Sequence, residues 1–110
     1  MSEHDTLARL AEVIASRRLE AGNTSYTRQL LDAGVERCAK KFGEEAVETV
    51  IAAMGKDTEQ LKAEAADTLY HLLVLLEARR IAFADVMAVL EGRMGTSGLA
   101  EKASRSRSAP

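Results

Sequence analysis

Apolar residues recur every three or four positions along most of the chain, which is the spacing that places them on one face of an α-helix. Helix-breaking signals are few, since the only proline is Pro110 and β-branched residues rarely cluster. The pattern therefore predicts an all-α fold, with helices near residues 7–14, 25–31, 35–54, 58–80 and 86–92.

Local signals fix several of the predicted helix ends. Ser25 or Thr24 is expected to cap the second helix, while Gly34 marks either a kink or a C-terminal cap. Gly55 is expected to end the third helix, and Asp57, with Gln60 three residues later, resembles a capping box that opens the fourth. Residues 81–83 are interpreted as a turn before the last helix.

The two longest predicted helices, 35–54 and 58–80, are joined by a short segment that contains Gly55. They should form an antiparallel hairpin with the short helices on its flanks. Because two long helices carry more apolar surface than short ones can cover, we expect a homodimer in which hairpins pack into a larger bundle. Residues 1–95 are assigned to this domain, and 96–110 to a mobile C-terminal tail.

Composition narrows the classes of function. The 110 residues fit one domain, and a net charge of -2 gives no basic footprint for nucleic acid. No apolar run approaches the roughly 20 residues that span a bilayer, and no secretory signal is readable at the N-terminus. The single cysteine, Cys38, excludes an internal disulfide and is expected in the core. We expect a cytoplasmic protein that binds neither membrane nor nucleic acid.

Two pairs of acids stand three residues apart, Glu45 with Glu48 and Glu64 with Asp67. With 17 acids in 110 residues, about two such pairs are expected by chance, so spacing alone does not separate a site from a solvated surface. The positions of these acids on their helices do distinguish a site from a solvated surface. Glu45 occupies an apolar seam position of its helix, and Glu64 occupies the corresponding seam of the partner helix. The hairpin would place both pairs at a similar distance from the turn near Gly55, so that the acids face each other.

Four converging carboxylates raise one another's pKa values and need a cation. Oxygen ligands without cysteine select a hard ion, and Mg²⁺ prefers a few carboxylates together with waters and substrate phosphates. The pattern thus predicts Mg²⁺-dependent phosphate chemistry, in which Glu44 or Glu48 orients a water molecule as a base.

Basic residues lie beside these acids. Lys41 shares a helix face with Glu45 and is predicted either to pair with it or to bind a phosphate, and Lys40 is a second candidate for phosphate binding. His71 follows Asp67 by four residues, which favours a hydrogen bond to Asp67 over metal ligation. His71 is also kept as a candidate substrate-binding residue.

Four segments resemble the phosphoribosyl-ATP pyrophosphatase family of the MazG-like all-α NTP pyrophosphohydrolase superfamily. They are SYTRQLLDAG, KKFGEEAVETVIAA, EAADTLYHLLVLL and SGLAEKASR. The superfamily pattern EExxE followed by ExxD is met by the two acid pairs and Glu44. The SYT, KKxG and YH elements, with the tail segment, resemble the phosphoribosyl-ATP branch.

The resemblance implies a nucleotide-binding hydrolase of histidine biosynthesis that converts phosphoribosyl-ATP to phosphoribosyl-AMP and pyrophosphate. It implies Mg²⁺ ligation by the four acids, support from Glu44, and polyphosphate contacts from Lys41 and Lys40. Two alternatives remain open: a house-cleaning hydrolase of ordinary or damaged nucleoside triphosphates, and a non-catalytic helical dimerisation module.

Overall fold

The computed structural model describes residues 5–20 and 25–94, and every regular element in these ranges is a helix. The prediction of an all-α fold is therefore confirmed for the part of the chain that the structure describes. The elements are α1 (Thr6–Ser16), the short 3-10 helix η2 (Arg17–Leu19), α2 (Tyr26–Ala33), α3 (Val35–Met54), α4 (Thr58–Ala78) and α5 (Phe83–Met94).

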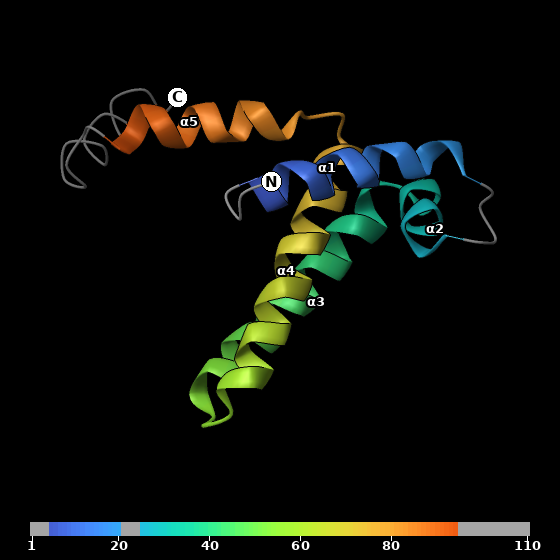
Figure 1. The fold of residues 1–110 in the computed structure, drawn as a ribbon. Helices are drawn as coiled ribbons and strands as arrows, with labels where there is room; N and C mark the ends of the chain where they lie inside the picture. The colour runs from blue at the N-terminus through green and yellow to red at the C-terminus, as the bar shows by residue number, and fades with distance from the viewer. Residues whose placement is uncertain (1–4, 21–24, 95–110) are drawn as a thin grey trace, which may run out of the picture.

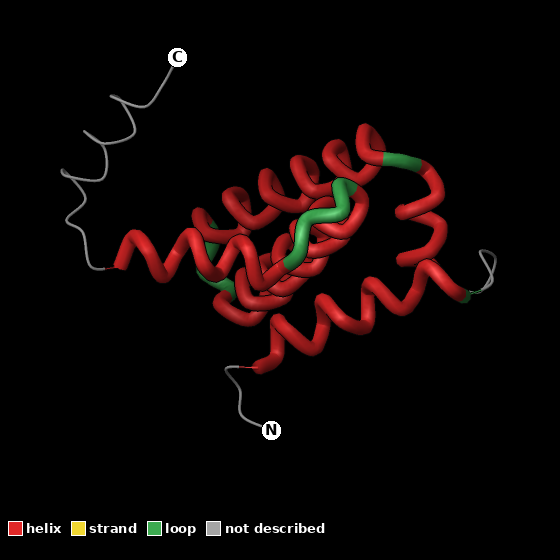
Figure 2. Tube along the Cα trace, turned by 90° about the horizontal axis from the view of Figure 1, so that it is seen from above, coloured by secondary structure: helices red, strands yellow, loops and turns green. Residues whose placement is uncertain are grey.

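Helices α3 and α4 form the predicted antiparallel hairpin, and α1, α2 and α5 gather at its open end (Figure 1). The same hairpin is seen from above in Figure 2. Gly34 separates α2 from α3 with a φ of 101°, a backbone conformation that glycine adopts without a steric penalty. At the closed end, Gly55 follows α3, and the Asp57 side chain accepts hydrogen bonds from the backbone N–H groups of Glu59 and Gln60. These predicted boundaries are confirmed.

The hydrophobic core lies at the open end of the hairpin, where α1 and α2 cover the start of α3 and the end of α4. Cys38 is buried there, as predicted, and its thiol donates a hydrogen bond to the backbone oxygen of Leu30. On α4, Leu73 is buried, whereas Leu69 is 43% exposed. The buried core residues are Ile14, Leu30, Leu31, Cys38, Leu73 and Val74.

Three predicted helix boundaries were wrong. The fourth helix ends at Ala78 rather than near Arg80, because Arg80 has a positive φ of 58° and its N–H turns back to the carbonyl of Glu77. Residues 81–83 are only in part a turn, since α5 begins at Phe83, whose side chain packs against the core. Gly92 lies inside α5, which continues to Met94. The predicted tail, residues 96–110, lies outside the described residues.

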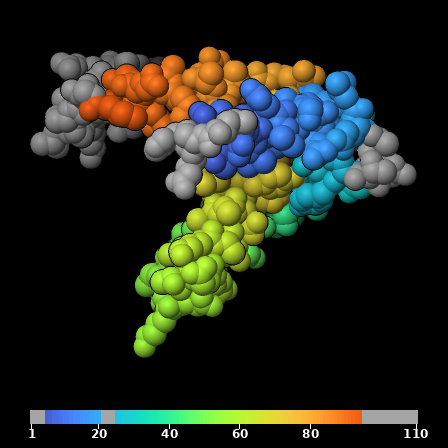
Figure 3. Space-filling model, viewed as in Figure 1, coloured from blue at the N-terminus to red at the C-terminus, as the bar shows by residue number. Residues whose placement is uncertain are grey.

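The closed half of the hairpin projects from the other helices (Figure 3). The radius of gyration is 16.3 Å, compared with about 13 Å for a compact chain of 100 residues. On this projecting half α3 exposes an apolar stripe, defined by Val47, Val50, Ile51 and Met54, whose exposed fractions are between 58% and 84%. None of the helices described is long and apolar enough to cross a membrane.

Candidate active site

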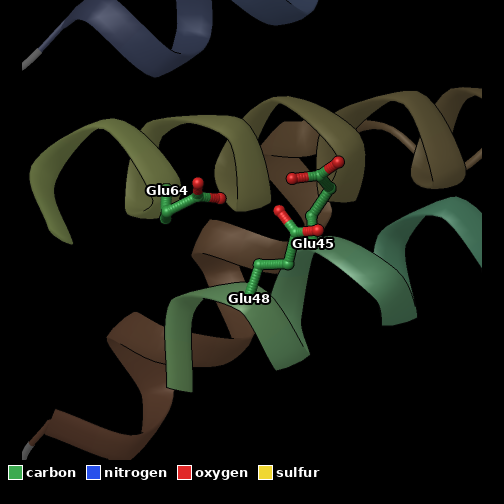
Figure 4. A group of neighbouring side chains, drawn as sticks. All are labelled: Glu45, Glu48 and Glu64. Carbon is green, nitrogen blue, oxygen red and sulfur yellow. The ribbon is translucent and has the colours of Figure 1, made fainter. Parts of the chain in front are cut away.

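Three carboxylates from the two hairpin helices meet midway along the hairpin. Glu45 and Glu48 extend from α3 and Glu64 from α4, so that one oxygen of each lies within 4.8 Å of the others (Figure 4). The spacing of three residues places Glu45 and Glu48 on one face of α3, and the antiparallel pairing brings α4 alongside that face. The structure thus brings together three of the four predicted acids.

Glu45 lies inside the seam that its sequence position predicted. Its side chain is only 13% exposed, and its neighbours along α3 at this seam, Phe42 and Thr49, are partly buried. Glu48 lies on the exposed side of the cluster. The cluster therefore has an inner wall between the helices and an outer side open to solvent.

Among the clustered acids, Glu64 has a raised pKa. Its Oε2 atom is buried and has no hydrogen-bond partner among the described residues. Burial raises the pKa of the Glu64 carboxyl, and repulsion from Glu48, Glu45 and Asp67 raises it further. A carboxylate that has a buried oxygen without a partner and lies beside two other carboxylates fits a cation, since buried polar atoms otherwise find a partner.

Asp67 does not join the three clustered oxygens, although it contributes to the field on Glu64. It lies three residues after Glu64 on the same helix and is exposed. Its side chain is one methylene shorter than that of Glu48, which reaches the cluster from the facing helix.

Lys41 is the cation nearest to the cluster in the described structure. Its Nζ lies 3.6 Å from Oε1 of Glu45 and 3.9 Å from Oε1 of Glu44. Sequence analysis left the choice between an ion pair and a phosphate contact open, and the structure shows the ion pair. One ammonium group does not neutralise the several carboxylates around it, so the site remains negative. Lys40 is exposed on the same helix.

His71 is buried beneath the site, with 6% exposure. Its ring meets the rings of Tyr70 and Tyr26 edge-on, at centroid distances of 4.8 Å and 6.3 Å. Burial lowers the pKa of His71, against the opposing effect of Glu45. No hydrogen bond joins His71 to Asp67 in the described residues, so that interpretation was wrong. A direct contact between His71 and a substrate stays a prediction, which the burial of the ring disfavours.

Sequence reasoning missed two groups that support the site. Thr49 and Thr68 bond across the hairpin directly behind the acids, and Tyr26 reaches His71 from a helix 45 residues away in the chain. The sequence shows that Thr49 and Thr68 each place a hydroxyl group in the seam of a helix, but it does not show that the two hydroxyl groups bond to each other. No spacing rule links Tyr26 to His71, because their contact depends on how α2 packs against α4.

An open hollow of about 790 Å³ adjoins the acids along α3. Its charged lining residues are described above, and Val47 and Ile51 of the apolar stripe also line it. The charged residues are Lys41, Glu44, Glu45 and Glu48. The hollow thus offers carboxylates for a hard cation, an ammonium group for an anion and an apolar wall. This combination suits a metal-bound phosphate ester with an organic part.

Comparison with known proteins agrees with this chemistry. The sequence model of the phosphoribosyl-ATP pyrophosphohydrolase family matches residues 7–94. A phosphoribosyl-ATP pyrophosphatase 1 from Bradyrhizobium diazoefficiens is 60% identical over 100 residues, which cover 91% of this chain and 94% of that protein. Phosphoribosyl-ATP pyrophosphatases from Cereibacter sphaeroides and Nitrobacter hamburgensis are 56% and 54% identical, over 90% and 93% of this chain and 96% and 95% of their own lengths.

Proposed function

The chain belongs to the phosphoribosyl-ATP pyrophosphohydrolase family, and we propose from this premise that its acid cluster binds Mg²⁺ for the hydrolysis of phosphoribosyl-ATP. Water is added across the anhydride bond between the α and β phosphates. The products are phosphoribosyl-AMP and pyrophosphate, in an early step of histidine biosynthesis. The cytoplasm, where nucleotides and free Mg²⁺ occur together, is the proposed place of action.

One observation carries the metal proposal: Glu64 has a buried Oε2 without a hydrogen-bond partner within the described structure, and its carboxylate lies with those of Glu45 and Glu48 so that one oxygen of each is within 4.8 Å of the others. Such an arrangement is costly when ionised, and a divalent cation removes the cost by replacing repulsion with attraction. The donor atoms are all oxygens, as a hard ion requires. The residues present therefore fit Mg²⁺.

Each acid is assigned a role from its position. Glu45 and Glu64 hold the ion from the inner wall, and Glu48 and Asp67 complete its ligands from the exposed side. When bound, Mg²⁺ neutralises phosphoryl oxygens and lowers the pKa of a coordinated water. Glu44 is 52% exposed beside Lys41, so an attacking water can reach its carboxylate, and it is proposed to accept the proton of that water, a role for which Glu48 is the alternative.

The basic residues are assigned to the polyphosphate. Lys41 already lies against Glu45, so its ammonium group is placed beside any phosphate that approaches the bound ion. Lys40, one residue earlier and exposed, is proposed to contact the outer part of the phosphate chain. His71 is proposed to act from beneath, by holding the rings of Tyr26 and Tyr70 in place.

A second copy of the chain is the proposed occupant of the apolar stripe. The stripe leaves four large apolar side chains more than half exposed, which a stable monomer rarely does in one contiguous surface. It also borders the hollow that holds Glu45 and Glu48. A homodimer formed through this stripe would bury it and wall off the open side of the site.

A pyrophosphate-release assay tests the proposed activity. With Mg²⁺, the protein should release pyrophosphate from phosphoribosyl-ATP faster than from ATP, and EDTA should abolish release. Glu48→Gln should remove most of the turnover, while Glu36→Gln, an exposed change on the same helix, should leave it intact. Preference for a plain triphosphate would favour a house-cleaning hydrolase instead. Full turnover by the Glu48→Gln variant would reject the assigned role of this acid.

A further inference from the structure

The two acid-bearing segments of the hairpin have the same pattern. Residues 45–49 read EAVET and residues 64–68 read EAADT, so each helix carries a glutamate followed four residues later by a threonine. Because the helices are antiparallel, these segments are related by a local two-fold axis. Thr49 and Thr68 meet on that axis, with their hydroxyl oxygens 2.7 Å apart.

The hydroxyl pair also contacts the backbone of the two inner acids. Thr49 Oγ1 lies 3.1 Å from the carbonyl oxygen of Glu45 and 3.0 Å from that of Glu64. Thr68 Oγ1 lies 3.0 Å from each of the same two oxygens. Each hydroxyl therefore lies within hydrogen-bond distance of a backbone oxygen of both inner acids.

Proton counting shows how the pair is bonded. Two hydroxyls bring two protons, and an oxygen separation of 2.7 Å is the usual length of an O–H···O bond. One proton therefore lies between the threonines, and the other is donated to a carbonyl oxygen of Glu45 or Glu64. Every such arrangement includes a bond between the helices, so the pair acts as a cross-link whichever way the protons point.

We propose that Thr49 and Thr68 form a clamp that fixes the distance between Glu45 and Glu64, and so sets the affinity of the site for a divalent cation. This inference rests on the proposed function, because it takes the cluster to be a metal site. The clamp opposes the repulsion that pushes the acids apart. Both threonines are positioning residues, since their hydroxyl groups bond to the backbone of the acids and to each other.

Replacing both threonines by valine tests the clamp with little change in side-chain shape. Two methyl groups cannot approach to 2.7 Å, since carbon atoms pack at about 3.5–4.0 Å. The Thr49→Val, Thr68→Val variant should therefore open the hairpin locally by about 1 Å, enough to loosen a preorganised site. The Thr49→Ser, Thr68→Ser variant keeps both hydroxyls and is the matched control.

Calorimetric titration with Mg²⁺ or Mn²⁺ alone gives a readout that does not depend on activity. The double valine variant should bind the ion roughly 10- to 100-fold more weakly, as changes behind metal ligands usually cause. The double serine variant should stay close to wild type. Circular dichroism and metal-free melting establish folding, and if the double valine variant does not fold, Thr68→Val alone is judged by the same criterion.

Wild-type affinity for the ion in the double valine variant would overturn the clamp. The clamp would also be overturned if the double serine variant lost as much affinity as the double valine variant, because serine keeps the hydroxyl groups and lacks only the methyl groups. Absence of divalent-ion binding by the wild type would also overturn it. If the wild type binds the ion but does not hydrolyse phosphoribosyl-ATP, the proposed function fails, while the clamp is still decided by the affinities.

Discussion

Glu64→Gln is the most direct test of the acid cluster, because glutamine keeps the shape of the side chain and removes its charge. Burial raises the pKa of the Glu64 carboxyl, and the charges of Glu48, Glu45 and Asp67 raise it further. The nearest cation, Lys41, is paired with Glu45. The substitution therefore relieves a repulsion in the metal-free protein and removes a proposed ligand of the metal ion.

The sign of the pH effect follows from linkage. A carboxyl whose pKa is higher in the folded than in the unfolded state costs no stability below its unfolded value, here 4.5, and destabilises the fold as pH rises through the folded pKa. Metal-free wild type should lose stability relative to the E64Q variant as pH rises from about 4.5 toward 7. At pH 7 in EDTA, the variant should be the more stable protein.

Mg²⁺ should reverse that order. A ligand present at 100 times its dissociation constant stabilises the folded state by about 2.7 kcal/mol. In a domain of this size, each kcal/mol shifts Tm by roughly 4–8 °C, so Mg²⁺ at this level should raise the wild-type Tm by about 10–20 °C. The variant, which lacks the charged inner ligand, should show a much smaller shift.

Thermal melting at one fixed protein concentration gives the Tm of each protein under four conditions. These are pH 4.5 and pH 7, each with EDTA or with Mg²⁺. Glu91→Gln removes an exposed charge on α5 and serves as the control, with melting close to wild type throughout. If the E64Q variant gains as much from Mg²⁺ as the wild type, or if it is less stable than wild type in EDTA at pH 7, the reasoning about the cluster is refuted.

Three further changes probe separate features. Lys41→Gln should lower kcat/KM roughly 10- to 100-fold, mainly through KM, because a charged hydrogen bond to phosphate is lost; steady-state kinetics showing unchanged KM would contradict the phosphate role. Ile51→Glu should convert the proposed dimer into a monomer in light scattering, whereas the exposed control Arg37→Glu should not, and a persistent dimer would place the interface elsewhere. Asp57→Ala should cost about 1 kcal/mol by uncapping α4, lowering Tm by about 4–8 °C; an unchanged Tm would show that the cap contributes nothing.

Features with local causes were predicted well from the sequence. The N-caps at Ser25 and Asp57 depend on a side chain and an N–H group two or three residues away, and both are present. Gly34 ends α2 with a φ of 101°, which glycine adopts without a steric penalty, and Gly55 follows α3 as predicted, although its backbone is extended with a φ of -88°. Glu45 was found because a carboxylate interrupted an apolar period.

Features with long-range causes were not predictable in this way. α5 begins early because Phe83 packs against the core, and it passes through Gly92 because an interior glycine costs only about 1 kcal/mol. His71 is buried by α2, which spacing along α4 cannot reveal. The clamp required knowing that Thr49 and Thr68 come into register, and that depends on the pairing of the whole hairpin.

The position of the acids along the hairpin reconciles stability with the proposed ion binding. Glu45 lies seven residues beyond the core residue Cys38, or about 10 Å along α3, so charge accumulates outside the core rather than within it. Beyond the acids, toward Gly55, the apolar stripe is exposed. The cluster thus lies between a core that is already packed and a surface that is not. If a second copy covers the stripe, the site becomes more enclosed without any change in the core, and the proposed ion would be bound in a drier environment where electrostatic interactions are stronger.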